Sequence, residues 1–187
     1  HEGELLAEET YYSVGGGFVV QEDSSAPSHH QVDLPYSVVK GDDLLQHVRN
    51  SGLDAVHVIR RNERVWRDES AIDAGLDRIA DEMFACIYRG CHAEGVLPGG
   101  LNVVRRAASQ NRHLLGGVTY PDPLAWRRAV AESARGFDES LRWLSAFALA
   151  VNEENAAFGR VVTAPTNGAA GVIPAVLFHA TVFRSLT

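Results

Sequence analysis

Lysine, cysteine and long apolar runs are almost missing from this sequence. Of its 17 basic residues only Lys40 is a lysine, and this bias is read as genome composition, without a functional meaning. No run approaches the roughly 18 apolar residues that a membrane-spanning helix needs, and we expect no signal peptide. The net charge of −7 argues against a surface for nucleic acid or an anionic membrane. We therefore expect a cytoplasmic protein that binds neither.

The two cysteines, Cys86 and Cys91, are too few to hold an iron–sulfur cluster, which needs three or four thiolates. Without a signal peptide a disulfide between them is also disfavoured. The adjacent pair His29 and His30 has no third ligand nearby, which is typical of a solvated loop rather than a metal site. We therefore expect two reduced cysteines and no metal ligand in this chain.

From residue 41 onward the sequence has the periodicity of amphipathic helices and shows no strand alternation. In two segments the apolar residues recur at steps of three and four, which predicts a buried face for each helix. These residues are Ile72, Leu76, Ile79, Met83 and Ile87 in the first segment, and Val130, Ala134, Phe137, Leu141, Leu144, Ala148 and Val151 in the second. The fold class is therefore predicted as mainly α, a helical bundle over residues 41–187.

Capping residues predict where these helices begin and end. The expected starts and ends are Asp42 or Asp43 to Gly52, a start at Asp54, Ser70 to Gly90, and Asp122 to Gly159 with a division near Gly136. Before the bundle, residues 10–20 have the β-branched and aromatic content of a strand, interrupted by three glycines. Residues 21–40 are rich in serine, proline and histidine, which is typical of a linker.

Residues 150–175 carry polar side chains where a helical core would be apolar. Asn152, Glu153, Glu154 and Asn155 directly follow the apolar run 144–151, and a second polar group at 163–168 precedes another apolar segment. A buried amide or carboxylate must find a hydrogen-bond partner or lower the stability of the fold. Two such clusters beside apolar helices therefore predict a polar pocket inside the bundle, with both clusters facing it.

Three blocks of the sequence closely resemble the bacterial iron–sulfur L-serine dehydratases (L-serine ammonia-lyases), in that family's order. They are residues 11–19 (YYSVGGGFV), 94–101 (EGVLPGGL) and 150–175 (AVNEENAAFGRVVTAPTNGAAGVIPA). The resemblance implies that residues 1–20 are the end of an N-terminal β domain, 21–40 a linker, and 41–187 the first part of a helical catalytic domain. Because the sequence opens at His1 without an initiator methionine, we expect a fragment that is inactive by itself.

The resemblance also implies a reaction, a cofactor and an oligomer for the full-length enzyme. L-serine loses water and yields pyruvate and ammonia, with a base removing the Cα proton and a [4Fe–4S] cluster acting as Lewis acid on the hydroxyl. The family's cluster cysteines lie downstream of residues 163–168, so the ligands are expected outside this chain. Ala170, where some members have cysteine, is not counted as a ligand. A homodimer is expected, and the catalytic base is not identified.

The residue types at 166–171 suggest how a substrate carboxylate could bind. Thr166 or Asn167 can cap a helix that begins near Gly168, and small residues let a ligand reach its free N–H groups, which favour anions. The predicted substrate-binding residues are Asn152, Glu153, Asn155, Thr163, Thr166, Asn167 and Gly168, while Glu154 is expected to be scaffold. A further pocket loop is predicted at Glu94, Pro98, Gly99 and Gly100.

Two readings stay open at this point. The first is a fragment of an L-serine dehydratase, and the second is a non-catalytic helical module that binds an amino acid or a partner chain. Both readings account for the same polar clusters, and for residues 166–171 an ordinary capped core helix with small residues for close packing is the alternative to a substrate site.

Overall fold

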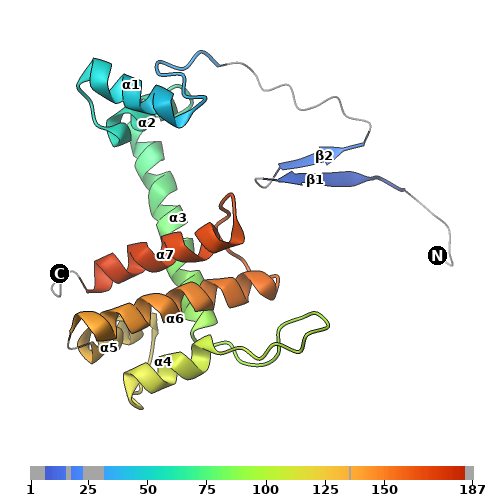
Figure 1. Cartoon of the computed structure of the whole chain (residues 1–187), viewed down its shortest axis with the longest axis vertical. Coiled ribbons are helices and arrows are strands. Elements are labelled where there is room, and N and C mark those ends of the chain that lie inside the picture. Colours follow the sequence, from blue (N-terminus) through green and yellow to red (C-terminus); the bar gives the residue numbers. More distant parts are fainter. Residues whose placement is uncertain (1–6, 16–17, 23–31, 135, 184–187) are drawn as a thin grey trace. The chain divides into compact units, whose positions relative to one another are not determined.

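The protein is described by a computed structural model at residues 7–15, 18–22, 32–134 and 136–183. Over these residues the chain forms two paired strands and seven helices (Figure 1). They are β1 (Tyr11–Gly15), β2 (Phe18–Gln21), α1 (Gly41–Ser51), α2 (Ala55–Glu63), α3 (Glu69–Gly90), α4 (Ala107–Leu115), α5 (Pro123–Ser133), α6 (Phe137–Ala156) and α7 (Asn167–Val182). The predicted mainly α class with a short strand remnant is confirmed.

The single strand predicted at residues 10–20 is instead a pair, β1 and β2, that forms a two-stranded antiparallel sheet. The sequence alone does not separate the two possibilities, because a run of glycines is compatible with a chain reversal as well as with a bulge in one strand. Gly16 and Gly17 lie outside the described residues, as do residues 23–31 of the predicted linker, which include His29 and His30.

The chain divides into two compact units. The first is formed by His1–Thr10 and Val20–Arg78, and the second by Tyr11–Val19 and Ile79–Thr187. In the first unit the predicted end of α1 at Gly52 and the predicted start of α2 at Asp54 are confirmed. The predicted start of α1 at Asp42 or Asp43 is wrong, because its N-cap is Lys40, whose N–H donates to the Asp43 carboxylate at 2.8 Å from the first turn of the helix. Gly52 ends α1 in the left-handed conformation with φ 68°, and the Asp54 carboxylate accepts the His57 N–H at 2.8 Å at the start of α2. The start of α3 is different: Asp68 rather than Ser70 accepts from the amide of Ala71, at 2.8 Å.

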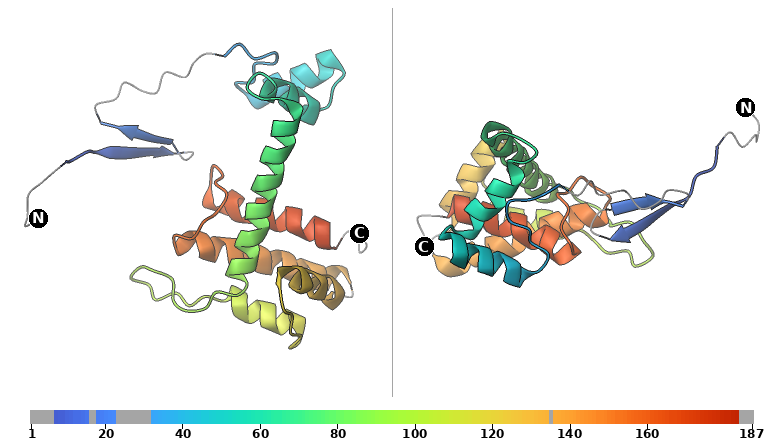
Figure 2. Two further views of the ribbon diagram at one scale, coloured as in Figure 1. Left: turned by 180° about the vertical axis from the view of Figure 1, so that it is seen from behind. Right: turned by 90° about the horizontal axis from the view of Figure 1, so that it is seen from above.

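Helices α6 and α7 lie side by side and run in opposite directions in the second unit (Figures 1 and 2). Their shared core is aromatic: the Trp126 ring of α5 stacks on Phe178 of α7 at 5.6 Å, and Phe147 of α6 meets Phe178 edge-on at 4.9 Å. Burial of each such side chain contributes about 1.5–3 kcal/mol. This aromatic cluster therefore fixes α5, α6 and α7 as one body.

The buried face of α6 differs from the predicted one. Phe137 and Leu141 are exposed, whereas Trp143, Phe147 and Ala150 are fully buried. Apolar residues lie around much of the circumference of this helix. A spacing of three and four residues therefore fits more than one face, and it does not show which face is buried. In α3 the same happens in part, since Ile72, Met83 and Ile87 are buried while Leu76 and Ile79 are exposed.

Gly90 ends α3 as predicted, but for a different reason than helix capping. A Cβ at this position would lie 2.3 Å from the backbone oxygen of Ala150 in α6 and 2.9 Å from its Cα. Gly90 therefore permits the backbones of α3 and α6 to touch where they cross, a contact that no side chain would allow.

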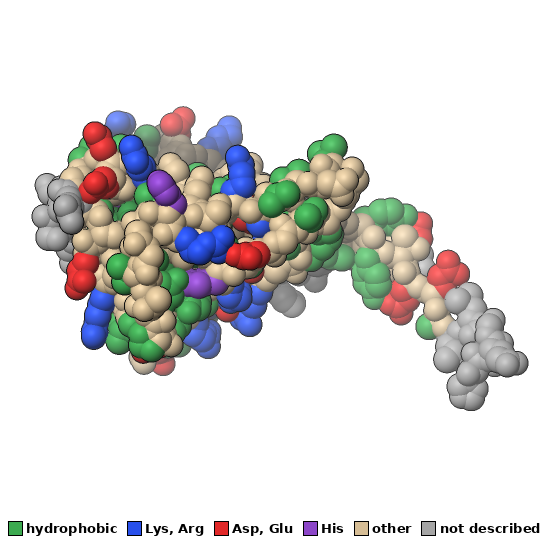
Figure 3. All heavy atoms as spheres, turned by 90° about the horizontal axis from the view of Figure 1, so that it is seen from below, with side chains coloured by type: hydrophobic (Ala, Val, Ile, Leu, Met, Phe, Trp, Pro, Cys, Tyr) green, Lys and Arg blue, Asp and Glu red, His purple; other side chains and the backbone are tan. Residues whose placement is uncertain are grey.

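The chain between α3 and α4 forms a hairpin-like loop. Val96 and Val104 form an isolated antiparallel bridge, and the Arg105 N–H donates to the Gly95 carbonyl at 2.9 Å. Apolar side chains on this loop are exposed, and Leu101 is 88% exposed. Hydrophobic side chains also lie among charged ones on the face of the molecule that Figure 3 shows. Among the helices that the structure describes, none is long and apolar enough to cross a membrane.

Candidate functional site

The N-terminus of α7 is open to solvent and is capped by Thr166. The Thr166 hydroxyl accepts the N–H of Ala169 at 3.1 Å, and the first intrahelical bond runs from the Ala170 N–H to the Thr166 carbonyl at 3.0 Å. The amides of Asn167 and Gly168 precede that bond and point out of the helix end. Of the two caps that the sequence left open, Thr166 is therefore the cap, and Asn167 is the first helical residue, with its side chain exposed.

Asn152 of α6 lies against the second turn of α7. Gly171 is buried there, and a Cβ added to it would stand 2.6 Å from the Asn152 Oδ1 atom. The amide of Asn152 thus occupies the space that a side chain at 171 would take, and it remains exposed on its other side. The structure therefore brings one member of the first polar cluster to the helix whose start carries the second cluster.

Glu153 faces α4 rather than α7. Its buried carboxylate accepts the N–H of Arg106 at 2.7 Å and that of Ala107 at 3.2 Å. Arg106 is the N-cap residue of α4 and has no side-chain cap bond of its own, so Glu153 supplies the cap from another helix. A role for Glu153 in substrate binding stays a prediction, and its two oxygens are engaged by these amides.

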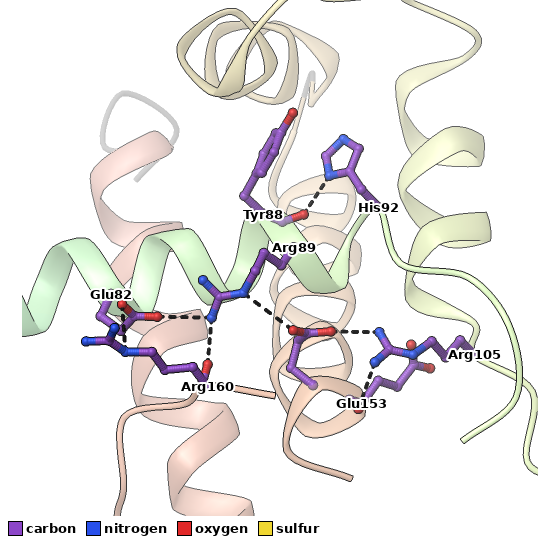
Figure 4. A network of polar contacts seen from close by, with 8 residues as sticks. Glu82, Tyr88, Arg89, His92, Arg105, Glu153 and Arg160 are labelled. Atoms are coloured by element: carbon purple, nitrogen blue, oxygen red, sulfur yellow. Dashed lines mark hydrogen bonds and ion pairs between the residues drawn. The ribbon is translucent and has the colours of Figure 1, made fainter. Parts of the chain in front are cut away.

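Glu154 lies between two arginines, Arg89 and Arg105, whose side chains are labelled in Figure 4. Its Oε1 atom accepts from Arg105 at 2.8 Å, and its Oε2 atom lies 3.5 Å from the Nε of Arg89. The side chains of Arg105 and Glu154 are 8% and 9% exposed, so this is a buried ion pair whose charges are compensated within the protein. This ion pair could not be predicted from the sequence, because its members come from α3, the loop before α4, and α6.

The remaining predicted residues are at the surface. Thr163 is exposed and Asn155 is half-buried near the end of α6. In the predicted pocket loop, Glu94 forms an exposed ion pair with Arg112, and Pro98, Gly99 and Gly100 are exposed at its tip. Gly99 has φ 118°, a conformation in which a side chain would be strained.

A separate hollow of about 550 Å³ opens between α4 and α6. Ser109, Gln110, His113, Leu114, Arg142 and Ser145 line it. It shares no residue with the predicted site.

Both cysteines are free and buried. Burial raises the pKa of Cys86 to about 11 and also raises the pKa of Cys91 well above its ordinary value. Among the described residues no group of three or more His, Cys, Asp or Glu side chains could hold a metal ion. The residues present therefore do not fit a [4Fe–4S] cluster.

We expect both thiols to resist modification in the folded protein. With a pKa near 11 only about one Cys86 thiol in a thousand is ionised at about pH 8, and only the thiolate reacts. A thiol assay with a chromogenic disulfide should therefore register almost no thiol in buffer and both thiols in guanidinium chloride. Rapid reaction of either cysteine without denaturant would contradict the buried placement.

Comparison with known proteins shows to which family the chain is similar. Residues 50–186 match the family described as serine dehydratase alpha chain. The L-serine dehydratase of Streptomyces coelicolor is 48% identical over 181 residues, 95% of this chain and 36% of that protein. That of Haemophilus influenzae is 43% identical over 93% of this chain and 36% of its own length. L-serine dehydratase TdcG of Escherichia coli is 43% identical over 97% and 37%. The chain spans little more than a third of these relatives.

Proposed function

Because this chain belongs to the serine dehydratase alpha-chain family, we propose that it is part of an L-serine ammonia-lyase that converts L-serine to pyruvate and ammonia. The support is the match over residues 50–186 and the relatives named L-serine dehydratase at 43–48% identity. Since the chain spans about 36% of those relatives, the activity is proposed for a longer polypeptide that contains it.

The observation that carries a substrate site is the open N-terminus of α7. The amides of Asn167 and Gly168 point outward, and a Cβ at Gly168 would meet nothing closer than the Thr166 hydroxyl at 3.9 Å. An anion can therefore approach these N–H groups without a steric barrier, and the helix dipole favours negative charge there. We propose that they bind the substrate carboxylate, with Asn152 as the neighbouring side chain from α6.

A [4Fe–4S] cluster is proposed as cofactor of the full-length enzyme, with its thiolates supplied from outside these 187 residues. Two cysteines, both buried and with raised pKa values, offer too few thiolates for a cluster that needs three or four. The residues of this chain are therefore assigned to binding and orienting the substrate. Residues 41–187 as the first part of the catalytic domain, action in the cytoplasm and a homodimeric state stay predictions.

Asn167→Ala is expected to lower serine deamination much more than it lowers stability. Asn167 is exposed and is not the cap, so its loss should change the free energy of unfolding by no more than about 0.5 kcal/mol. The Asn167 side chain is proposed as a further contact to the substrate beside these amides, and misplacing a substrate can cost on the order of 100-fold in rate. The measurement is kcat/KM for L-serine in the full-length enzyme, beside a chemical denaturation curve.

Thr166→Ala is the matched stability control. Removal of the cap should lower the free energy of unfolding by about 1 kcal/mol, which Asn167→Ala should not do. If the turnover of Asn167→Ala fell only in proportion to the loss of folded protein, Asn167 would be scaffold, and the substrate site would have to lie elsewhere.

A further inference from the structure

We infer that Arg89 is a positioning residue that holds the segment 160–165, and through it the start of α7, in place. This inference rests on the proposed function, because the start of α7 is where the substrate carboxylate is proposed to bind. Arg89 itself lies in the last turn of α3 and touches neither Thr166 nor Asn167 through any contact found among the described residues.

The guanidinium of Arg89 meets three acceptors at once (Figure 4). Its Nη2 atom donates to the carbonyl oxygen of Arg160 at 2.6 Å and to the Glu82 carboxylate at 3.0 Å, and its Nε lies 3.5 Å from the Glu154 carboxylate. These groups come from three places in the chain: the same helix, the end of α6, and the loop that leads to α7. Arg89 therefore joins α3 to Arg160, the first residue of the segment 160–165.

The same loop is held at two further points beside Arg89. The Nε atom of Arg160 lies 3.1 Å from the second oxygen of Glu82, and the N–H of Gly159 donates to the Glu154 carbonyl at 2.8 Å. A Cβ at Gly159 would stand only 2.8 Å from the Glu154 carboxylate, so the chain passes directly over that ion pair. The segment is thus held at Arg160, six residues before the Thr166 cap.

Arginine suits this position because its planar group presents five N–H donors in a fixed geometry. An ammonium group is a compact point charge at the end of a flexible stem, so lysine could keep the ion pair with Glu82 but could not hold all three acceptors. Removing the guanidinium leaves the Arg160 carbonyl without its donor and the loop free to move at its base. The position of the α7 start would then be less well defined, and a substrate bound there would be misplaced.

The test compares Arg89→Ala and Arg89→Lys with wild type in the full-length enzyme. Hydrogen–deuterium exchange should rise in the peptide covering residues 160–169 in both variants. The KM for L-serine should rise on the order of 10-fold in Arg89→Ala, beyond any loss of folded protein. Arg89→Lys keeps the charge beside Glu82, so it serves as the informative variant if Arg89→Ala folds poorly. Arg128→Ala, on the exposed face of α5, is the matched control and should change neither quantity.

Unchanged exchange at residues 160–169 in both Arg89 variants would overturn the inference. So would raised exchange with an unaltered KM and a kcat that falls only with the folded fraction, since that pattern describes a structural contact alone. If the wild-type enzyme did not deaminate L-serine, the proposed function would fail, while the exchange measurement would still decide whether Arg89 holds the loop.

Discussion

Gly90→Ala is expected to lower the free energy of unfolding by about 3 kcal/mol, because the new methyl group would stand 2.3 Å from the Ala150 oxygen. The obstacle is backbone, which cannot rotate away as a side chain can, so α3 and α6 would have to separate where they cross. Separation would also loosen Cys86, Ile87 and Phe147, which lie in the core of that unit. Denaturant unfolding followed by circular dichroism measures the change.

Gly75→Ala, in the same helix, is the matched control with the opposite sign. Nothing lies within 4 Å of a Cβ at Gly75, so alanine there meets open space and only restricts the unfolded chain. We expect a gain of about 0.5–1 kcal/mol from the better helix former. Two Gly→Ala changes in one helix should therefore move stability in opposite directions. Equal effects at both sites would mean that the close crossing at Gly90 is absent in solution.

Glu154→Ala is the second change with a large expected effect. It removes the carboxylate between Arg105 and Arg89 and leaves the Arg105 guanidinium, only 8% exposed, buried without its counter-charge. Breaking a buried pair from one side costs about 3–5 kcal/mol. The same denaturation measurement applies, and Glu94→Ala is the matched control. That change breaks a pair with Arg112 whose side chains are 62% and 64% exposed, so it should cost no more than about 1 kcal/mol.

A double variant distinguishes the effect of an unpaired buried charge from the effect of lost side-chain volume. Replacing Arg105 by methionine and Glu154 by leucine removes both buried charges and keeps similar volume. It should recover most of the stability that Glu154→Ala loses, because an apolar pair can replace a buried ion pair at little cost. A double variant as unstable as Glu154→Ala would show that the pair contributes geometry that apolar side chains cannot supply.

The sequence predicted well those features that depend on neighbouring residues. The starts at Asp54 and Asp122 and the end at Gly52 were correct, because a helix cap is decided within one turn of the chain. The predicted start of α3 was wrong by two positions. Asp68 and Ser70 are both good N-cap residues, and the local sequence does not show which of them caps the helix. The same ambiguity between Thr166 and Asn167 was resolved only by the backbone of α7.

Features that join distant parts of the chain could not be predicted. Glu153 was predicted to line a pocket because it lies in a polar cluster next to an apolar run. Its hydrogen-bond partners are instead the backbone N–H groups of Arg106 and Ala107, which lie 46 to 47 positions earlier in the chain. Gly90 resembles an ordinary helix end, and only the crossing with Ala150 reveals why glycine is needed there. The buried face of α6 was predicted wrongly because apolar periodicity reports only where apolar side chains lie around the helix. The neighbouring helices decide which of these side chains become buried.

The cap that Glu153 gives to α4 has a consequence for the order of events during synthesis. Helix α4 has nine residues, fewer than the roughly 12–15 at which an isolated helix becomes marginally stable, and its own N-cap residue offers no side-chain bond. It must wait for a carboxylate that is translated 47 residues after Arg106, a delay of roughly 2–10 s at ribosomal speed. During that interval the apolar residues Ala107, Ala108 and Leu115 have no core to enter. We therefore expect residues 107–115 to lack stable helical structure during synthesis until α6 has been made.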